Sequence, residues 1–214
     1  MRMENKQSLE WVVKNRKSTR SFSNEMLKEE EINRILESAI YAPYGGATGI
    51  PLSQIRKIFI FKQGTENMST LRELIHSQIN RNARIFRVIL ILMPFLKKKL
   101  SAFSNRLNGM SKNGISSLRE APYFIVIAEK KGFPPVGKQS MAHALENMWL
   151  TATSLGLGFQ LVSATSNMSK NKDFMLLLGL KKGEYSVEGC AIGYPKKVSG
   201  QKKELNLDNF AVWR

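Results

Sequence analysis

The sequence predicts a single domain of the α+β or α/β class, with helices packed around one sheet. Its 214 residues suit one domain and are enough to bury most of the apolar side chains. Short apolar runs typical of strands alternate with longer segments in which apolar residues recur at helical spacing. The composition, 43% hydrophobic and 23% charged, is that of a globular protein and excludes a disordered, collagen-like or coiled-coil chain.

The first third of the chain is predicted to be mainly helical. Helices are expected at residues 8–15, 28–42 and 66–86, and a strand at 57–61. The second helix is the clearest, because its apolar residues fall on a single face. Pro43 ends it and begins a loop, residues 43–51, which leads toward the strand.

Residues 87–118 are the least regular part of the sequence. An apolar run at 89–95 is followed by three lysines at 97–99 and then by a segment rich in Ser, Asn and Gly. We expect a partly helical insertion that leaves the core and acts as a lid, with a mobile far end around Gly109 and Gly114. A helix that folds over and covers a dimer is the alternative.

The rest of the chain alternates strands and helices. Strands are expected at residues 123–128, 159–164 and 187–193, and helices at 140–155 and 170–178. A basic C-terminal extension, about residues 200–214, follows. It ends in an apolar stretch that is extended enough to pair with another segment.

The charge balance is unusual. Thirty-three Lys and Arg against 17 Asp and Glu give a net charge of +16, with a pI near 10.1. Such a balance suits an anionic partner, such as phosphate, nucleic acid or a membrane surface, but a solvated lysine-rich surface explains it equally well. The sequence lacks an arginine-rich arm, zinc-finger spacing and an aromatic-and-basic RNA-binding signature. We therefore expect no nucleic-acid partner.

Several protein classes are excluded by what the sequence lacks. No run approaches the ~18 apolar residues of a transmembrane segment, and the N-terminus has no signal-peptide core. His76 and His143 lack metal-ligand spacing, and the single Cys190 cannot form an intrachain disulfide. We expect a cytoplasmic protein without a metal centre.

Two segments carry residues suited to a flat, phosphorylated ligand. Residues 16–20 place three cations and two hydroxyls within five positions, enough to surround one phosphate. The loop at 43–51 contains three glycines, which let backbone approach a flat ligand closely. It has neither the Walker ending nor the strand that precedes a Rossmann fingerprint. A third candidate segment is 193–195, followed by Lys202 and Lys203.

Five short motifs together resemble the nitroreductase family, which binds flavin mononucleotide (FMN). They stand here as Arg-Lys-Ser-Thr-Arg-Ser-Phe at 16–22, Ala-Ile-Tyr-Ala-Pro at 39–43, Glu-Ala-Pro at 120–122, Gly-Leu-Gly at 156–158 and Gly-Tyr-Pro at 193–195. Their order and spacing cover nearly the whole chain, and residues 87–118 are the unmatched insertion.

The resemblance implies both a fold and an activity. The fold is a single nitroreductase-like domain of the α+β class, an α/β sandwich whose mixed, mainly antiparallel sheet is flanked by helices. Two copies form a homodimer, with flavin at the subunit interface and the C-terminal extension wrapped around the partner. The activity is that of an FMN-dependent oxidoreductase that takes hydride from NADH or NADPH. It then reduces an electron-poor small molecule, a nitroaromatic or quinone, by a ping-pong mechanism. Because the cofactor carries this chemistry, no catalytic side chain is named.

The resemblance also assigns residues to FMN. Those matched to the phosphate and ribityl chain are Arg16, Lys17, Ser18, Arg20, Lys202 and Lys203. Those matched to the isoalloxazine ring are Ser163, Ala164 and Thr165 from the same subunit, and Pro43, Tyr44 and Thr48 from the loop at 43–51, whose Pro-Ser pair in the family reaches the ring from the other subunit.

This chain departs from the family pattern beside the ring. Tyr44 stands where the family usually has Ser, and Thr48 and Ile50 replace the Asn and Gln of an Asn-x-Gln-Pro-Trp motif. Thr offers a hydroxyl where Asn has both a donor and an acceptor, and Ile offers no polar group. A non-catalytic flavin-binding protein is therefore one alternative. A basic protein that binds nucleic acid or a membrane surface, suggested by the net charge and by residues 89–99, is another.

Overall fold

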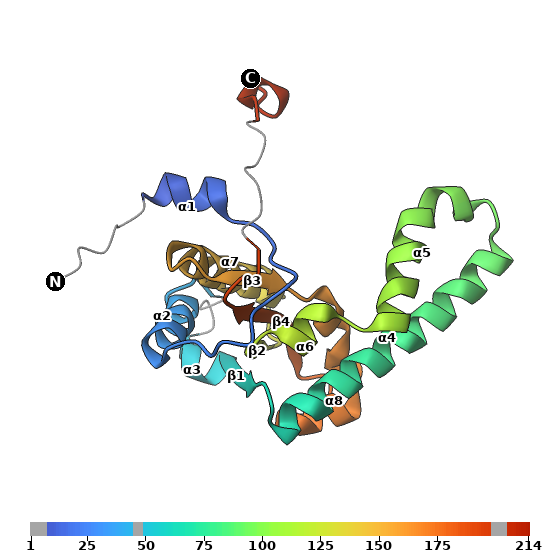
Figure 1. Ribbon diagram of the computed structural model, residues 1–214, viewed down its shortest axis with the longest axis horizontal. Helices are drawn as coiled ribbons and strands as arrows, with labels where there is room; N and C mark the ends of the chain where they lie inside the picture. The colour runs from blue at the N-terminus through green and yellow to red at the C-terminus, as the bar shows by residue number, and fades with distance from the viewer. Residues whose placement is uncertain (1–7, 45–48, 198–204) are drawn as a thin grey trace.

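A four-stranded sheet forms the centre of the protein (Figure 1). The computed structural model describes residues 8–44, 49–197 and 205–214. The strands lie in the order β1 (Arg56–Lys62), β2 (Tyr123–Lys130), β4 (Tyr185–Gly193) and β3 (Gly158–Leu161), and each neighbouring pair is antiparallel. The expected α+β class is confirmed. The expected mixed sheet is not, because these strands are wholly antiparallel and the parallel pairing described is an isolated bridge between Ser18 and Phe159.

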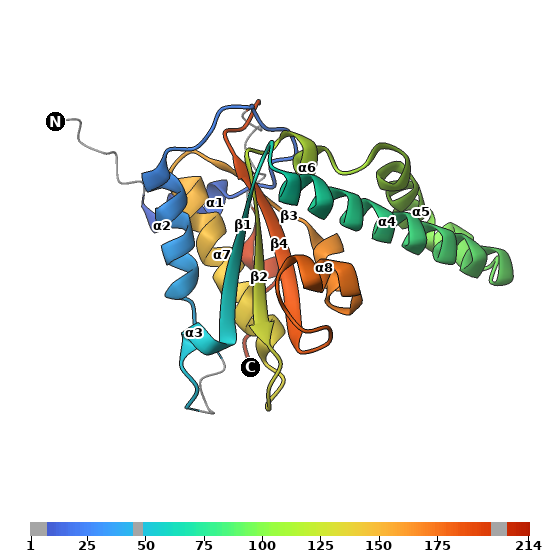
Figure 2. The ribbon, with the colours of Figure 1, turned by 90° about the horizontal axis from the view of Figure 1, so that it is seen from below.

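Helices cover both faces of this sheet (Figure 2). One face carries α2 (Glu29–Ile40) and α7 (Gly137–Ser154), and the other carries α4 (Glu66–Leu92), α8 (Lys172–Leu177) and the 3₁₀ helix η2 (Ser163–Lys170). The remaining helices are α1 (Leu9–Asn15), α3 (Leu52–Ile55), α5 (Leu96–Asn113), α6 (Ser116–Glu120) and the 3₁₀ helix η3 (Leu207–Asn209).

Strand β2 shows why the sheet needs helices on both sides. Its residues alternate between the two apolar cores, with Phe124 and Val126 in one and Ile125 and Ile127 in the other. All four are fully buried. A strand that is apolar at successive positions is stable only when both of its faces are covered. The continuous apolar run at residues 123–128 therefore indicates a central strand of a three-layer fold.

Helix α4 is longer than its sequence pattern predicts, ending at Leu92 rather than near residue 86. The aliphatic residues after Phe86 continue the helix, and Pro94, which cannot donate a helical hydrogen bond, follows its end. Helix α5 then returns along α4, so residues 87–118 are indeed partly helical. Gly109 lies inside α5, and Gly114 ends it with φ of 69°.

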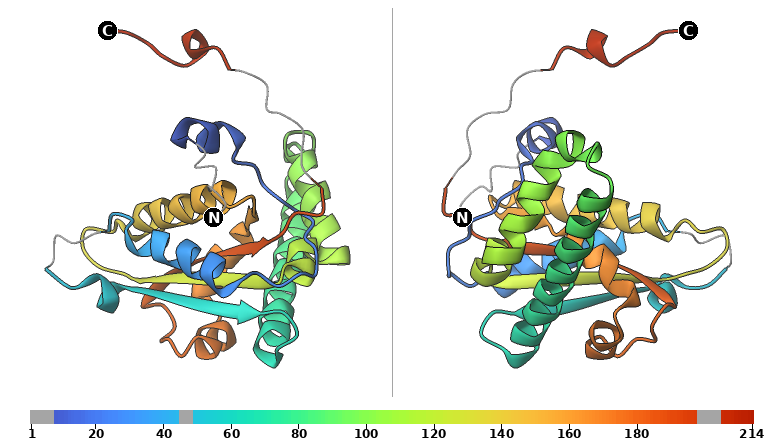
Figure 3. Two further views of the ribbon diagram at one scale, coloured as in Figure 1. Left: turned by 60° about the vertical axis from the view of Figure 1, so that its left-hand side comes forward. Right: turned by 90° about the vertical axis from the view of Figure 1, so that its right-hand side faces the viewer.

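The second half of α4 and helix α5 form a hairpin, which we call the arm (residues 80–113), that projects from the side of the sheet (Figures 1 and 3). The rings of Phe86 and Phe103 meet edge to face with centroids 5.1 Å apart. Near its base, Ser111 Oγ donates to Asn80 Oδ1 at 2.6 Å. These contacts fix the two helices side by side.

The C-terminal residues 205–214 stand clear of the sheet and its helices (Figure 3). They form the single turn of η3, and their apolar side chains are exposed, with Trp213 91% and Val212 80% exposed. The apolar character expected from the sequence is present, but Leu207–Asn209 form a helical turn rather than an extended stretch. The proposed role of this extension in a dimer is taken up below.

Candidate cofactor-binding groove

Residues 16–22 lie across one end of the sheet and join its two neighbouring strands. Ser18 forms the parallel bridge to Phe159 of β3, and the Thr19 N–H donates to the Phe159 carbonyl at 2.9 Å. A few residues later Phe22 forms an antiparallel bridge to Pro195, just beyond β4. The first and last of the five motifs therefore touch each other, although they stand near opposite ends of the chain.

Two glycines allow this close approach. A Cβ on Gly158 would lie 2.6 Å from Thr19 Cγ2, and a Cβ on Gly193 would lie 2.4 Å from Pro122 Cδ. These separations are shorter than any ordinary contact, so a side chain at either position would push the chain segments apart. Gly158 thus leaves the space that Thr19 occupies, and Gly193 leaves space for Pro122 and, at 3.2 Å, for Phe22 Cδ1.

Glu120, in the Glu-Ala-Pro motif, contacts the first motif and a residue just after the last motif through one oxygen. Its Oε2 accepts hydrogen bonds from Ser21 Oγ at 3.0 Å, from the Phe22 N–H at 3.1 Å and from Lys196 Nζ at 3.2 Å. Burial alone would raise the pKa of Glu120, but the hydrogen bonds from Phe22, Ser21 and Lys196, with the charge of Lys196, together lower it. The charged carboxylate therefore holds residues 16–22 against the end of α6 and the segment after β4.

The tyrosine of the Gly-Tyr-Pro motif has a structural role. Tyr194 Oη donates to Glu31 Oε2 on α2 at 2.7 Å, and this hydrogen bond, with partial burial and the charge of Glu31, raises the pKa of Tyr194 to about 12. The Ser23 N–H donates to the Tyr194 carbonyl at 2.9 Å. The motif thus ties α2 and the N-terminal segment to the end of β4.

Arg16 is held between a carboxylate and an indole ring. Its Nε lies 2.9 Å from Glu146 Oε1 of α7, an ion pair, and its guanidinium carbon lies 4.2 Å from the centroid of Trp149. Trp149 in turn stacks on Phe159 with centroids 5.0 Å apart, and its Nε1 donates to the carbonyl of Lys17. A guanidinium has five N–H donors, and the ion pair with Glu146 is made at Nε. Arg16 is therefore oriented by the protein and retains donors for an anion.

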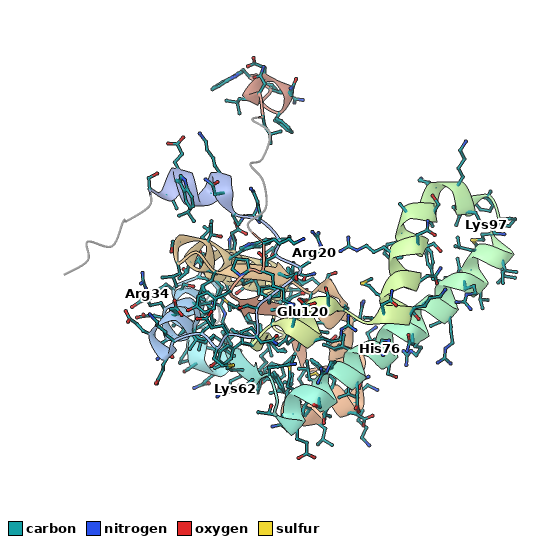
Figure 4. The ribbon with its side chains drawn as sticks, viewed as in Figure 1. Arg20, Arg34, Lys62, His76, Lys97 and Glu120 are labelled. Carbon is teal, nitrogen blue, oxygen red and sulfur yellow. The ribbon has the colours of Figure 1, made fainter. Side chains whose placement is uncertain are left out.

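Of the other three predicted phosphate ligands of this segment, Ser18 and Arg20 are exposed and Lys17 is half-buried. The Arg20 carbonyl accepts from Ser116 Oγ of α6 at 2.9 Å, which places this residue beside Glu120 between the sheet and the arm (Figure 4). Arg16, Ser18 and Arg20 therefore lie in one segment that runs beside the start of β3, with Ser18 and Arg20 exposed.

Two cavities flank β3 at the edge of the sheet. One, of about 300 Å³, lies against α7 and is lined by Glu146, Trp149, Phe159 and Glu188 among others. The other, of about 380 Å³, lies against the base of the arm, where Phe86, Phe103, Arg106, Leu107 and Met110 face Gln160 and Ala164. Both cavities are lined by Leu161 and Ser163. Together with residues 16–20 they define what we call the β3 groove.

The three residues matched to the isoalloxazine ring differ in exposure. Ser163 is exposed and lines both cavities, and Ala164 is half-buried and lines the larger one. Thr165 is fully buried, and a Cβ on Gly189 of β4 would lie 2.7 Å from its Oγ1. Its side chain faces the sheet rather than either cavity. These residues begin η2 instead of continuing the strand, which ends at Leu161.

Pro43 and Tyr44 lie on the other face of the sheet from η2. Both are exposed, and they follow α2, whose buried residues pack with those of α7. The Pro43 carbonyl accepts from Arg56 Nη2 at 3.3 Å. The structure therefore does not bring these two residues together with Ser163 in one chain. Thr48, Lys202 and Lys203 lie outside the described residues.

A buried ion pair, which the sequence did not predict, anchors the segment that contains Pro43 and Tyr44. Arg56 Nε donates to Glu129 Oε1 at 2.6 Å, across the register of β1 and β2, and Ser140 Oγ donates to the same oxygen at 2.8 Å. The guanidinium also donates to the Ala39 carbonyl in the last turn of α2 and to Pro43. Neither Arg56 nor Glu129 belongs to a recognisable sequence motif, because their pairing depends on the register of two strands.

Glu188 is the other residue that sequence reasoning missed. It lines the smaller cavity from β4, and burial raises its pKa to about 7, an effect that the charge of Lys138 partly opposes. A carboxylate in an otherwise apolar strand, Val-Glu-Gly-Cys-Ala-Ile-Gly at 187–193, was the signal available in the sequence. Its protonation state therefore changes near neutral pH.

The described residues form neither a metal-binding cluster nor a membrane-spanning helix. Within residues 8–44, 49–197 and 205–214, no group of His, Cys, Asp and Glu side chains is arranged to hold a metal ion. None of the helices placed in those ranges has the length and apolarity that crossing a membrane requires.

Comparison with known proteins gives the same family as the motifs. The model of the nitroreductase family matches residues 13–194. No curated protein matches the chain. Among solved structures, a nitroreductase with bound FMN from Bacteroides fragilis is 17% identical, with a TM-score of 0.71 over 97% of this chain and 100% of that one.

Other structures agree. A nitroreductase with bound FMN from Desulfitobacterium hafniense is 20% identical and covers 99% of this chain and 100% of its own, with a TM-score of 0.68. A BluB-like flavoprotein from Clostridium difficile is 22% identical over 97% of this chain and 99% of its own, also at 0.68. At such identities the likeness concerns the fold, and the family model covers most of the sequence. The chain belongs to the nitroreductase family.

Proposed function

We propose that the protein is an FMN-dependent oxidoreductase whose cofactor lies along the β3 groove. The observation that carries this proposal is the placement of residues 16–20 at one end of the edge strand β3 and of Ser163 just beyond the other end. Three residues separate Phe159, which pairs with Ser18, from Ser163, so the four extended steps between them span at most roughly 13 Å. An anion site and a cavity at that separation suit a phosphate and a ring joined by a ribityl chain.

The residues of the groove fit FMN chemically. Arg16 and Arg20 are cations and Ser18 is an exposed hydroxyl, the groups expected around a phosphate. At the larger cavity, Gln160 Oε1 is buried without a hydrogen-bond partner in the described structure. An unpaired buried acceptor suits a ligand that brings an N–H donor, as the polar edge of a flavin ring does. Lys17, Lys202 and Lys203 are proposed as further phosphate ligands from the family pattern.

Bound FMN would supply the redox chemistry, taking hydride from NADH or NADPH and then reducing an electron-poor acceptor, a nitroaromatic or quinone, in ping-pong order. The protein's own residues bind and orient. Arg16, fixed by Glu146 and Trp149, and Ser18 position the phosphate. Ser163, Ala164 and the backbone at Thr165 form the wall beside the ring. The apolar residues at the base of the arm exclude water from the larger cavity and favour flat, apolar acceptors.

A homodimer completes the proposed site. Pro43 and Tyr44 are exposed and lie across the sheet from Ser163, so they are available to contact a ring held by another subunit. Thr48 belongs to the same loop in the sequence. The exposed apolar residues of 205–214 offer a surface for the partner. These features support a dimer in which each flavin contacts both chains.

The phosphate assignment is tested by FMN affinity. We expect Arg16→Ala to weaken FMN binding by about 1.5–3 kcal/mol, the range for a hydrogen bond to a charged group, and to leave riboflavin binding unchanged. Glu146→Gln is the matched control, because it removes the ion pair with Arg16 but keeps the guanidinium. Its FMN affinity should be retained or raised. Equal FMN affinity of Arg16→Ala and the parent protein, measured by flavin fluorescence, would remove this assignment.

A non-catalytic flavin-binding protein is the second candidate, and the observation that favours it is the replacement of the family's Asn and Gln by Thr48 and Ile50. Both candidates predict a yellow protein with a flavin spectrum. Oxidation of NADH or NADPH followed at the nicotinamide absorbance separates them, because only the enzyme turns over.

The proposed lid has a test of its own. Replacing residues 95–114 with a short Gly-Ser linker removes most of the wall that the arm contributes to the larger cavity. We expect the flavin spectrum to remain and the preference among quinones and nitroaromatics to change. If all activities scale by one factor, the arm does not select acceptors.

A further inference from the structure

The arm carries charge of one sign only. Residues 80–113 contain eight Lys and Arg and no Asp or Glu. Three of these cations, Lys97, Lys98 and Lys99, are exposed at the start of α5, and Figure 4 shows Lys97 at the far end of the arm. A surface this long with no acidic residue produces an unbalanced positive potential.

The far end of the arm is also apolar and exposed. Four residues at or next to the turn between α4 and α5, which we call the tip, are exposed by 66% (Ile91), 75% (Leu92), 46% (Met93) and 76% (Phe95). They are continued along α4 by Ile85, Val88 and Ile89, which are also exposed and lie at helical spacing with Leu92. Burying this cluster would be favourable, and the base of the arm does not cover it.

Charge decides which kind of partner suits such a surface. A second copy that placed its own tip against this one would bring Lys97–99 of the two copies together, so tip-to-tip self-association is opposed electrostatically. Nucleic acid would satisfy the cations but gives aliphatic side chains such as Leu92 little to bind. An anionic lipid surface satisfies both, because exposed apolar side chains enter the headgroup region while Lys and Arg contact the phosphates.

We propose that the tip of the arm, with Lys97–99, docks the protein reversibly on anionic membranes. Residues 91–95 insert at the interface and the lysines bind lipid phosphates. This proposal goes beyond the oxidoreductase function and does not depend on bound FMN. The base of the same arm lines the larger cavity, so docking places that cavity near molecules dissolved in the lipid.

Vesicle sedimentation tests the docking. The full chain should sediment with phosphatidylcholine vesicles that contain about 30% phosphatidylglycerol and stay in solution with phosphatidylcholine alone. Raising the salt from about 0.1 M to about 1 M should weaken binding strongly. Leu92→Ser/Phe95→Ser and Lys98→Glu/Lys99→Glu should each weaken it by about tenfold or more.

The chain offers matched controls. Leu176→Ser on α8 changes an apolar residue that is 73% exposed, and Lys181→Glu/Lys182→Glu makes the same charge change at another exposed lysine pair. Both should bind vesicles nearly as well as the parent protein. If they lose binding as severely as the tip variants, general positive charge is responsible and the docking surface is refuted.

A labelled variant tests the tip without removing it. Cys190 is fully buried, and burial raises the pKa of its thiol, so a cysteine introduced at Leu92→Cys reacts selectively with an environment-sensitive dye. On anionic vesicles the dye at position 92 should shift to the blue, while the same dye at Leu176→Cys should not. An unshifted dye at position 92 refutes insertion.

Two further results would overturn the proposal. Light scattering that shows the parent protein as a dimer and Leu92→Ser/Phe95→Ser as a monomer would mean that a second copy covers the tip. Binding to single-stranded DNA that competes fully with vesicles, and that the Leu92→Ser/Phe95→Ser variant loses equally, would assign the surface to nucleic acid. Unchanged oligomeric state with lost vesicle binding is the result expected.

Discussion

Removal of the Arg56 side chain is expected to destabilise the protein strongly. Arg56 and Glu129 are 2% and 1% exposed, and Arg56 also donates to the carbonyls of Ala39 and Pro43 and to Ser140 Oγ. Arg56→Ala leaves the Glu129 carboxylate buried with Ser140 as its hydrogen-bond donor. Losing one partner of a buried ion pair costs about 3–5 kcal/mol, because the other charge stays desolvated. The same change frees the last turn of α2 and the loop that carries Pro43.

Urea denaturation of matched variants measures this effect. Lys62→Ala, an exposed residue at the other end of β1, should change the free energy of unfolding by less than about 0.5 kcal/mol. The double variant Arg56→Met/Glu129→Met removes both charges and should recover most of the loss, since apolar replacement of a buried pair is often close to neutral. A double variant as unstable as Arg56→Ala would refute the reasoning, because the cost could not then come from an unpaired carboxylate.

Three further predictions follow from the groove and the termini. Gly158→Ala should displace Thr19, which lowers the free energy of unfolding by about 1–3 kcal/mol and also lowers FMN affinity. Gly132→Ala, where the added methyl group meets open space, should change neither quantity. Calorimetry measures the stability of both variants, and flavin titration measures their affinity. The raised pKa of Glu188 means that the folded state binds more protons than the unfolded state between pH about 4.5 and about 7, so the free energy of unfolding should fall across that window as pH rises. Glu188→Gln should abolish this slope in urea titrations at several pH values. Deleting residues 204–214 should yield monomers and release flavin together, and a truncated protein that stays dimeric and yellow in light scattering contradicts that role.

The strands and the fold class were predictable because their signal is local. Strands β2 and β4 are apolar at successive positions, and such runs report burial on both faces whatever the topology. The C-terminal end of α4 was harder to predict from the sequence. Its aliphatic residues 88–92 suit either a strand or a helix, and the pairing with α5 that makes them helical is tertiary.

The site was predictable only where a motif carries it. Residues 16–22 form a recognisable segment, and the structure places them beside β3. The carboxylate that holds Arg16 comes from α7, and the partner of Arg56 comes from an adjacent strand. Such pairs depend on packing and register, which composition and periodicity do not report. Thr165 is the opposite case: the resemblance matched its position to the isoalloxazine ring, but the structure shows its side chain buried.

The contacts of residues 16–22 have a consequence for synthesis of the chain. This segment leaves the ribosome early, but the residues that hold it are Glu120, Phe159, Pro195 and Lys196, all from the second half of the sequence. Contacts between such distant residues form late, because a long loop must close first. The β3 groove is therefore completed only after nearly the whole chain has been translated, and a nascent chain that stops before β4 lacks both the bridge from Phe22 to Pro195 and the contact of Lys196 with Glu120.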